Sequence, residues 1–320
     1  MLGEYILGVD GGGTQTKCSI ISLDGFFHAS GKAGPSNPIT IGVEEAHRNI
    51  MEAVKKASKK CGINKFKTSV LGIAGTDRSK LKDVLFDMLP ENFGEKEIVS
   101  DAEAAVAGAI ACKPGIIVIA GTGSIVYGKN WEGVTARAGG WGWRLGDEGS
   151  GYAIGKNAII SSLKAHDGRG PPTSLTSLIT KKLGLEKLEE IIDWAYDPGR
   201  QPRDFASLVP IVRKAEKDGD EVASLVLGEA GSDLGLVTHA VIRRLDLDKE
   251  FPAAFSGGIF KDSGPYTIAL EEVIRREAPE CFFITPMFGA DIGSCLLALE
   301  KLGIIIDDEI LRRLNNSIGK

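Results

Sequence analysis

The stretch Tyr5–Asp24, YILGVDGGGTQTKCSIISLD, decides the fold of this chain. An apolar run ends on Asp10, three glycines and Thr14 follow, and a second apolar run completes the stretch. This pattern predicts two strands joined by a tight polar turn. Glycines carry no side chain that keeps an anion away from the backbone, so their N–H groups can point at phosphate oxygens, and a threonine adds a hydroxyl donor. We therefore expect a phosphate-binding turn made of Gly11, Gly12, Gly13 and Thr14.

This turn differs from the two commoner nucleotide-binding loops. It lacks the Gly-Lys-Ser/Thr of a P-loop and the six-residue spacing of a Rossmann fingerprint. Asp10, at the end of the first apolar run, is placed to hold a metal ion through water. Because glycine-rich hairpins also occur with no ligand at all, the phosphate assignment depends on whether the pattern recurs.

The pattern does recur in the second part of the chain. Residues Gly115–Asn130 read GIIVIAGTGSIVYGKN, with a turn between two apolar runs that consists of Gly121, Thr122, Gly123 and Ser124. A third glycine turn, Ser256–Gly258, follows the apolar run Phe251–Phe255. Glycine makes up 41 of the 320 residues, about twice its usual share of roughly 7%. Two similar hairpins predict an internally duplicated fold in which each half supplies one phosphate-binding turn.

The composition indicates a globular protein of two domains. The chain has 320 residues, of which 43% are hydrophobic and 25% charged, enough for each domain to bury its own core. A net charge of −5 and a pI near 5.6 give no general attraction for nucleic acid or for an anionic membrane. The five cysteines are scattered and form no Cys-x-x-Cys pair, so neither a disulfide framework nor a zinc site is expected. Residues 1–10 predict neither a secretory signal nor a membrane span, and we expect a cytoplasmic protein.

The first half reads as alternating strands and helices. After the hairpin we expect a loop over 31–42 and then a helix whose apolar stripe runs over 43–57 and which Gly62 closes. A strand is expected over 68–74, and a short strand over 97–100 delivers Asp101 to an alanine-rich helix over 102–111.

The second half repeats the plan with a large helical insertion. After its hairpin comes a helical stretch from 152 to about 245, interrupted near 168–172 and 197–202. Strands are expected over 251–255 and 281–285, and helices over 290–302 and 307–315. Because ligands of α/β sheets bind beyond the carboxyl ends of the strands, we expect a cleft between the two domains.

Six motifs, taken in order, resemble those of a known family. They are Asp10-Gly-Gly-Gly-Thr14, Ser100-Asp-Ala102, Gly121-Thr-Gly-Ser124, Gly139-Gly-Trp-Gly142, Gly146-Asp-Glu-Gly149 and Ser256-Gly-Gly258. Their order and spacing, over nearly the whole chain, resemble the sugar kinases of the actin-like ATPase superfamily. The best match is the N-acetylglucosamine kinase branch, which is grouped with the BadF/BadG activator-type ATPases.

The resemblance implies an α/β fold of duplicated ribonuclease-H-like domains with an interdomain cleft. The first domain would span 1–112, and the second would span 113–302 with a helical insert at about 152–245. A closing helix at about 303–318 would pack back on the first domain. A homodimer is usual in similar kinases, so the resemblance implies one here.

The resemblance also implies a reaction, the transfer of the γ-phosphate of ATP to the 6-hydroxyl of a hexosamine with Mg²⁺ present. N-acetylglucosamine is the favoured acceptor, and glucosamine or a broad range of hexoses is the near alternative. Phosphoryl transfer needs phosphate charge neutralised, a nucleophile in line and an acceptor for the hydroxyl proton. The two hairpin turns and Lys17 would grip the phosphates, while Gly257 and Gly258 would let the adenosine lie close to the backbone. The aspartate at the position of Asp101 is the base in similar kinases.

Asp101 also has a structural interpretation. Ser-Asp-Ala-Glu ahead of a helix is an N-cap sequence, worth about 1 kcal/mol without any catalysis. The two roles are compatible, because a carboxylate at a helix N-terminus stays ionised and ready to accept a proton.

The segment Gly139–Gly149 suits a sugar, which offers an apolar face to an aromatic ring and hydroxyls to carboxylates and amides. Within it, Gly140, Trp141 and Asp147 match the family's sugar-contacting positions, as does Asn37 earlier in the chain. Asn37 has a simpler alternative, because Ser-Asn-Pro is a common turn. Trp143 and Arg144 have no clear counterpart in the family, and a core tryptophan is the better interpretation of Trp143.

Three other classes fit parts of the pattern. An activator ATPase for a dehydratase needs closely placed cysteines for a shared iron–sulfur cluster, and the scattered cysteines oppose it. A sugar-responsive repressor would carry a helix-turn-helix and a zinc-binding cysteine cluster, neither of which we expect here. An actin-like filament protein would leave the Trp141–Asp147 loop unexplained.

Overall fold

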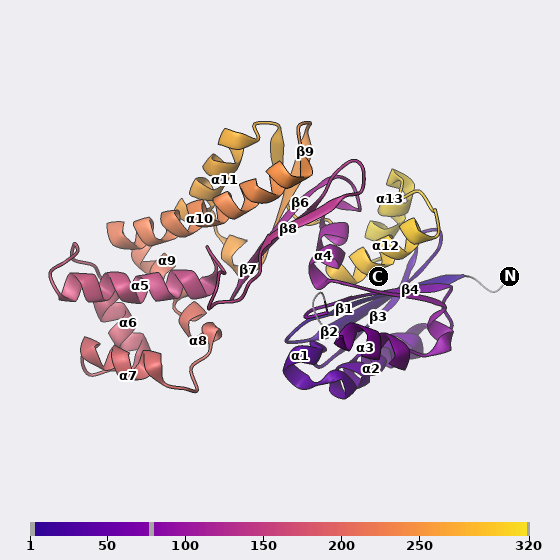
Figure 1. The fold of residues 1–320 in the computed structure, drawn as a ribbon, viewed down its shortest axis with the longest axis horizontal. Coiled ribbons are helices and arrows are strands. Elements are labelled where there is room, and N and C mark those ends of the chain that lie inside the picture. The colour runs from indigo at the N-terminus through magenta and orange to yellow at the C-terminus, as the bar shows by residue number, and fades with distance from the viewer. Residues whose placement is uncertain (1–3, 77–79, 319–320) are drawn as a thin grey trace. The chain divides into compact units, whose positions relative to one another are not determined.

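The computed structural model describes residues 4–76 and 80–318. The chain forms two compact units. Unit 1 comprises Met1–Ile117 with Thr285–Lys320, and unit 2 comprises Val118–Ile284. Each unit is built on a five-stranded sheet with helices packed against it (Figure 1). The duplication expected from the two glycine hairpins is therefore present as two sheets.

The sheet of unit 1 has the strand order β3-β2-β1-β4-β5. Its strands are β1 (Tyr5–Gly11), β2 (Thr16–Ser22), β3 (Phe27–Ala33), β4 (Thr68–Ile73) and β5 (Glu95–Val99). β2 runs antiparallel to both of its neighbours, whereas β1, β4 and β5 run parallel. Gly11 pairs with Thr16, which confirms the predicted hairpin and places its turn between these two residues.

β3 lies partly where the sequence predicted a loop. The expected loop 31–42 overlaps β3 at its start, and a short helix, α1 (Pro38–Ile41), forms near its end. The segment FHASGKA has little apolar periodicity of its own. It pairs with β2 and packs under a helix so closely that a Cβ at Gly31 would collide with the carbonyl oxygen of Ala53. Tertiary packing therefore decides this strand.

Helices cover both faces of this sheet (Figure 1). They are α2 (Val43–Cys61), α3 (Leu81–Met88), α4 (Asp101–Ile110), α12 (Ala290–Lys301) and α13 (Asp308–Ser317), with a 3-10 turn η1 (Glu91–Phe93). α2 confirms the predicted helix, because its apolar stripe is buried and Gly62 ends it with a left-handed φ of 74°. Leu7 and Val9 of β1 pack with α2 and α3, while Ile6 packs with α4, α12 and α13. Both faces of β1 are thus buried.

α12 belongs to unit 1, although the sequence analysis placed 113–302 in the second domain. The Ser294 hydroxyl donates to the Val9 carbonyl oxygen at 2.8 Å. Gly293 lies so close to Ala104 of α4 that a Cβ there would collide with the backbone. These contacts tie α12 to the first sheet, so the chain returns to unit 1 earlier than the expected boundary near residue 303.

The sheet of unit 2 repeats the same topology, with the order β10-β9-β6-β7-β8. Its strands are β6 (Gly115–Ala120), β7 (Ser124–Lys129), β8 (Thr135–Gly139), β9 (Phe251–Ser256) and β10 (Cys281–Ile284). Read in the opposite direction, β8-β7-β6-β9-β10 corresponds to β3-β2-β1-β4-β5. The second hairpin and the strands expected over 251–255 and 281–285 are confirmed, and β8 was not predicted.

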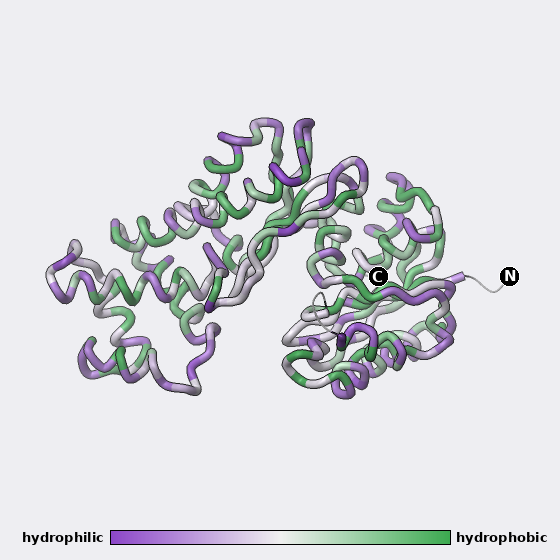
Figure 2. Tube along the Cα trace, viewed as in Figure 1, coloured by the Kyte–Doolittle hydropathy of each residue, from purple (hydrophilic) through white to green (hydrophobic). Residues whose placement is uncertain are grey.

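Most helices of unit 2 come from the predicted helical stretch 152–245. They are α5 (Gly151–His166), α6 (Leu175–Leu183), η2 (Leu188–Glu190), α7 (Ile191–Tyr196), α8 (Pro202–Ala206), α9 (Val209–Lys217) and α10 (Glu221–Leu245), followed by η3 (Gly258–Lys261) and α11 (Pro265–Glu277). The expected breaks separate α5 from α6 and α7 from α8. The helices alternate hydrophobic and hydrophilic residues along the tube in Figure 2, as helices with one apolar face do.

α10 is the longest helix among the described residues, with 25 residues. Its length and apolar composition would let it cross a membrane, but half of its most apolar window is buried inside the protein. Leu227, Leu234 and Val241 are among its buried residues. Packing against the rest of unit 2 accounts for this apolar face.

Candidate active site

The first glycine turn projects from the sheet of unit 1 toward solvent. The Gly12 N–H donates to the Gln15 carbonyl oxygen at 3.0 Å and closes the turn, and Gly13 and Thr14 are exposed. A Cβ at Gly13 would meet nothing within 4 Å, whereas one at Gly11 would collide with the Ser36 hydroxyl. Gly11 therefore serves close packing, while the tip of the turn is open to an anion.

Asp10 lies at the end of β1, directly before this turn. The pKa of its carboxyl is raised to about 7, first by burial and then by the nearby Asp291 and Asp101 carboxylates, while Lys17 opposes the increase. The carboxylates of Asp10, Asp101 and Asp291 repel one another beside the turn that is expected to bind phosphate, and a bound cation would relieve this repulsion. Among the described residues, no three His, Cys, Asp or Glu side chains form a ready-made metal cage. This arrangement fits Mg²⁺, which is commonly held by one or two carboxylates, phosphate oxygens and water.

Lys17 is held in place by a residue that the sequence analysis missed. The Lys17 ammonium lies 2.9 Å from Oδ1 of Asp291, whose Oδ2 accepts from the Ser19 hydroxyl at 2.5 Å. Asp291 is 1% exposed and stands in the first turn of α12. An acidic residue on the buried face of an apolar helix was the signal that could have identified it.

Asp101 is the first residue of α4, and it is exposed. The N-cap is Ser100, whose hydroxyl accepts from the Glu103 N–H at 3.0 Å. The structural role considered for Asp101 therefore belongs to its neighbour. Asp101 instead presents a carboxylate in the first helical turn, close enough to Asp10 to affect its pKa.

Asn37 adopts the turn role that the sequence offered as its alternative. Its Oδ1 accepts from the Ile39 N–H at 3.0 Å and caps α1. A Cβ at Gly75, in the turn after β4, would lie 2.6 Å from that oxygen. Asn37 is thus fixed beside the end of β4 in unit 1.

The second glycine turn is seated on the N-terminus of α5 in unit 2. The carbonyl oxygens of Gly121 and Thr122 accept from the N–H groups of Gly151 and Tyr152 at 2.8 and 3.1 Å. These bonds satisfy two of the N–H groups that a helix leaves unpaired at its start. The Thr122 side chain is exposed.

Asp147 lies beneath this turn and is only 7% exposed. Its carboxylate accepts from the backbone N–H groups of Ser124, at 3.4 Å, and Gly142. Burial raises the pKa of this carboxyl, and the backbone hydrogen bonds partly offset that effect. Its φ of 63° is left-handed, a conformation that aspartate tolerates better than most residues.

The segment Gly139–Gly149 forms an exposed loop beside the turn. Trp141 is 55% exposed, and the Arg137 guanidinium lies 5.2 Å from its ring centroid. Gly140 has a φ of 67°, and a Cβ there would press against Ile125. The Trp143 ring packs edge-on against the Tyr152 ring of α5, with the two centroids 5.4 Å apart, and so anchors the loop. Trp143 is 37% exposed, so the expectation of a core tryptophan is wrong.

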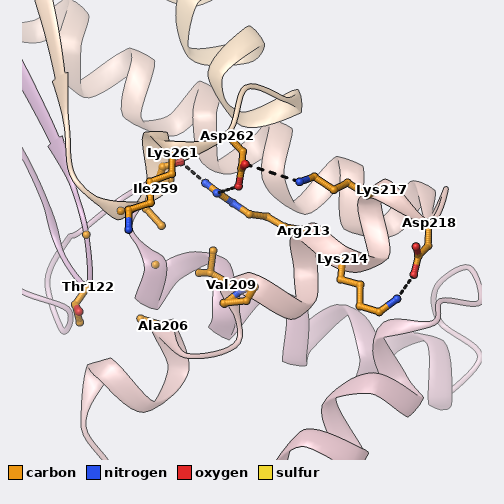
Figure 3. A pocket seen from close by; sticks show the side chains of 14 residues that line it. Thr122, Ala206, Val209, Arg213, Lys214, Lys217, Asp218, Ile259, Lys261 and Asp262 are labelled. Atoms are coloured by element: carbon orange, nitrogen blue, oxygen red, sulfur yellow. Dashed lines mark hydrogen bonds and ion pairs between the residues drawn. The ribbon is translucent and has the colours of Figure 1, made fainter. Parts of the chain in front are cut away.

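A pocket of about 660 Å³ opens in unit 2 where the second and third glycine turns meet (Figure 3). Thr122 and Gly258 both line it. Gly257 has a φ of 114°, and a Cβ there would collide with the carbonyl oxygen of Ala120. Ala206, Val209 and Ile259 supply apolar wall.

The same pocket has a basic wall that the sequence analysis did not identify. Arg213 pairs with Asp262 at 2.5 Å, Lys217 lies 3.8 Å from that carboxylate, and Lys214 pairs with Asp218. Within the described part of the chain, Lys261 has no ion pair. The pocket lining carries four cationic and two acidic side chains, Arg213, Lys214, Lys217 and Lys261 against Asp218 and Asp262, which suits an anionic ligand.

The structure brings the expected residues together in two groups. In unit 1 these are Asp10, Lys17 and Asp101, with the first turn following directly on Asp10. In unit 2 the second turn adjoins both the pocket and the loop that contains Gly140, Trp141 and Asp147. The cleft expected between the domains stays a prediction.

Comparison with known proteins agrees with this arrangement. A family model described as the BadF/BadG/BcrA/BcrD ATPase family matches residues 7–298. An N-acetylmuramic acid/N-acetylglucosamine kinase of Clostridium acetobutylicum is 35% identical over 92% of this chain and 98% of its own length. An N-acetyl-D-glucosamine kinase of Dictyostelium discoideum is 36% identical over 94% of this chain and 99% of its own length.

A solved structure supports the fold independently. A candidate N-acetylglucosamine kinase from Chromobacterium violaceum superimposes with a TM-score of 0.71 and 28% identity, covering 92% of this chain and 99% of that one. The expected class, an α/β fold of two duplicated actin-like domains, is confirmed.

Proposed function

We propose a phosphotransferase reaction for this chain, which belongs to the BadF/BadG/BcrA/BcrD ATPase family. The protein is an ATP-dependent sugar kinase that transfers the γ-phosphate of ATP to the 6-hydroxyl of a hexosamine, with N-acetylglucosamine as the favoured acceptor. Similarity to curated kinases over nearly their full length supports this reaction class.

The observation that carries the proposal is the position of Asp101. Its carboxylate is exposed at the start of α4 while Ser100 caps the helix. The positive end of the helix favours the ionised form, which can accept the proton of the sugar hydroxyl as the phosphate transfers. Its electrostatic interaction with Asp10 supports a role for both carboxylates in one region of unit 1.

Each phosphate-binding residue has a proposed part. The N–H groups of Gly13 and Thr14, at the exposed tip of the turn, bind phosphate oxygens, while Gly11 and Gly12 shape the turn. Lys17, oriented by Asp291, adds positive charge. Asp10 would hold Mg²⁺ through water. When bound, this ion neutralises charge on the phosphates as it develops during transfer.

The nucleotide occupies the pocket of unit 2. Its volume, about 660 Å³, is in the range of small-molecule sites. The adenosine lies along Gly257 and Gly258 against the apolar wall, and the phosphates extend toward the turn Gly121–Ser124 with Thr122 as a hydroxyl donor.

The sugar contacts the loop Gly139–Gly149. Trp141 presents an exposed ring face to the sugar, and Gly140 permits close approach of the backbone. Asn37 and Asp147 complete the proposed set, Asn37 through its amide nitrogen, because its oxygen caps α1.

Alternative acceptors are N-acetylmuramic acid, glucosamine and glucose. The activator-ATPase alternative requires accessible cysteines, yet Cys18, Cys112, Cys281 and Cys295 are buried. Burial raises the pKa of the Cys18 and Cys281 thiols to about 12, which opposes the thiolate form that ligates iron. The kinase reaction is therefore preferred to the activator class. We further propose that the protein acts as a homodimer in the cytoplasm.

The test is ADP release by the purified protein with Mg-ATP and each of five sugars. The sugars are N-acetylglucosamine, N-acetylmuramic acid, glucosamine, N-acetylmannosamine and glucose, with a no-sugar control. The proposal expects strong stimulation by at least one hexosamine. Hydrolysis that is indifferent to every sugar would refute it and favour the activator class.

A further inference from the structure

We propose that Ser124 is a positioning residue that couples the nucleotide turn to the sugar loop within unit 2. This inference rests on the proposed function, because it assumes that the turn binds phosphate and that the loop binds sugar. It gives Ser124 a different role: its side chain connects the turn Gly121–Ser124 to the loop Gly139–Gly149 and does not bind phosphate itself.

All three polar groups of Ser124 face the loop. Its hydroxyl donates to the Glu148 carbonyl oxygen at 2.7 Å, and its N–H donates to Asp147 Oδ1 at 3.4 Å. Its own carbonyl oxygen accepts from the Gly140 N–H at 3.0 Å. Ser124 is 5% exposed, so its hydroxyl is committed to the loop and not directed at solvent.

Asp147 fills the space under the turn from the loop side. A Cβ at Gly123 would lie 2.8 Å from Asp147 Oδ2, so only glycine leaves room for this carboxylate. The left-handed φ of Asp147 places its side chain there. A shift of the turn must therefore displace the loop, and a shift of the loop must displace the turn.

A second connection runs through Tyr152. Its N–H donates to the Thr122 carbonyl oxygen at 3.1 Å, and its ring packs against Trp143 at 5.4 Å. Tyr152 in turn packs on Phe205 of α8. Trp143 has no counterpart in the family motif. Through Tyr152 it connects the loop to α5, the helix whose N-terminus is hydrogen-bonded to the turn.

These contacts predict that each ligand orders part of the site for the other. If turn and loop move as one body, a nucleotide that fixes the turn also fixes the loop, and the sugar then binds to a site already ordered. Couplings of this kind are typically 5- to 150-fold in affinity and are reciprocal.

The experiment measures sugar affinity by calorimetry with and without a non-hydrolysable ATP analogue and Mg²⁺. In the wild-type protein, we expect the analogue to tighten N-acetylglucosamine binding by about tenfold. Ser124→Ala should reduce this factor to about twofold or less while each ligand alone still binds. Thr122→Val is the matched control, because its exposed side chain lies on the same turn: it should weaken the analogue but keep the coupling factor.

Asp147 provides a second pair of variants with a different readout. Asp147→Asn keeps an oxygen acceptor for the Ser124 N–H and tolerates the left-handed backbone, so it should retain the coupling factor. Asp147→Ala should lose it. Loss in both variants alike would show that coupling needs the charge of Asp147 and not its hydrogen bond to the Ser124 N–H, and would overturn that hydrogen bond as the connection.

Two results would overturn the inference and leave the kinase proposal intact. They are a coupling factor near one in the wild-type protein, and a wild-type factor retained in Ser124→Ala, in either case with sugar-dependent ADP release preserved. Failure of the wild-type protein to bind either ligand would instead overturn the proposed function.

Discussion

The two glycine turns have nearly the same sequence pattern, yet their surroundings differ. The turn of unit 1 is surrounded by charge, with Asp10 before it, Lys17 after it and Asp291 behind Lys17. The turn of unit 2 is held mainly by backbone hydrogen bonds, to α5 on one side and to the loop on the other. The two turns therefore share a sequence pattern but lie in different settings, and we propose that unit 1 supplies charge for the chemistry while unit 2 positions the ligands.

The largest expected effect is on kcat, from a substitution among the charged residues of unit 1. Asp101→Asn removes the proton acceptor but keeps its shape, and general-base catalysis typically contributes 10²- to 10⁴-fold. We expect kcat to fall by about 10³-fold while the affinity for ATP stays within about threefold. Steady-state kinetics and nucleotide titration measure both, with Asp83→Asn on α3 as the matched control. Activity within tenfold of the wild-type value would remove Asp101 from the mechanism.

In the turn of unit 2, we expect steric fit to determine how much a substitution destabilises the fold. Gly123→Ala forces a methyl group against the Asp147 carboxylate, and overpacking of this kind typically costs about 1–3 kcal/mol. Gly121→Ala, in the same turn, meets nothing within 4 Å and should change the free energy of unfolding by less than about 0.5 kcal/mol. Urea unfolding compares the two. Equal losses would mean that the turn does not rest on Asp147.

The Lys17 pair gives a smaller effect. Among the residues that the structure describes, Lys17→Met leaves the buried Asp291 carboxylate with the Ser19 hydroxyl as its side-chain partner. The lysine side chain is 34% exposed, so solvent weakens the penalty. We expect a loss of about 1–2 kcal/mol in stability and a raised KM for ATP. Lys214→Met breaks an exposed pair on α9 and serves as the control for stability. If both variants lose the same stability, Asp291 does not depend on Lys17.

The remaining effect is a pH dependence of stability at Asp10. Its folded pKa, about 7, lies above its ordinary value of 3.8, so the native state binds this proton more tightly than the unfolded state. Stability from this group is fully present below about pH 4 and is lost as pH rises through about 7.

Asp10→Asn should therefore raise the melting temperature at pH 8 more than at pH 5, measured without nucleotide or metal. Asp87→Asn, exposed on α3, is the control. If Asp10→Asn changes the melting temperature by the same amount at pH 5 and at pH 8, the ionised Asp10 carboxylate is not destabilised in the fold.

Local sequence signals predicted both hairpins, α2 with its terminal glycine and the interrupted helical stretch of unit 2. These elements depend on periodicity and turn chemistry within a few residues. β3 and β8 were missed because strands with short or weak patterns form by pairing with a neighbour. Asp291 was missed because its partner Lys17 lies 274 positions away in the sequence.

Site roles were harder to predict than site membership. The sequence placed Ser124 and Asp147 in the candidate site, but it did not predict the hydrogen bond between them. It also left Asp101 with two roles, and the structure gives the N-cap role to the Ser100 hydroxyl. Such contacts depend on backbone angles, such as the φ of 63° at Asp147, that no local pattern specifies.

The central claim is that both turns serve one transfer of phosphate to a sugar. The most direct measurement is a single turnover with γ-³²P-labelled ATP, Mg²⁺ and N-acetylglucosamine, followed by separation of the labelled products. We expect the label to appear on the 6-hydroxyl of the sugar, and Asp101→Asn to slow its appearance by about 10³-fold. Label found only in inorganic phosphate, at a rate independent of the sugar, would contradict it.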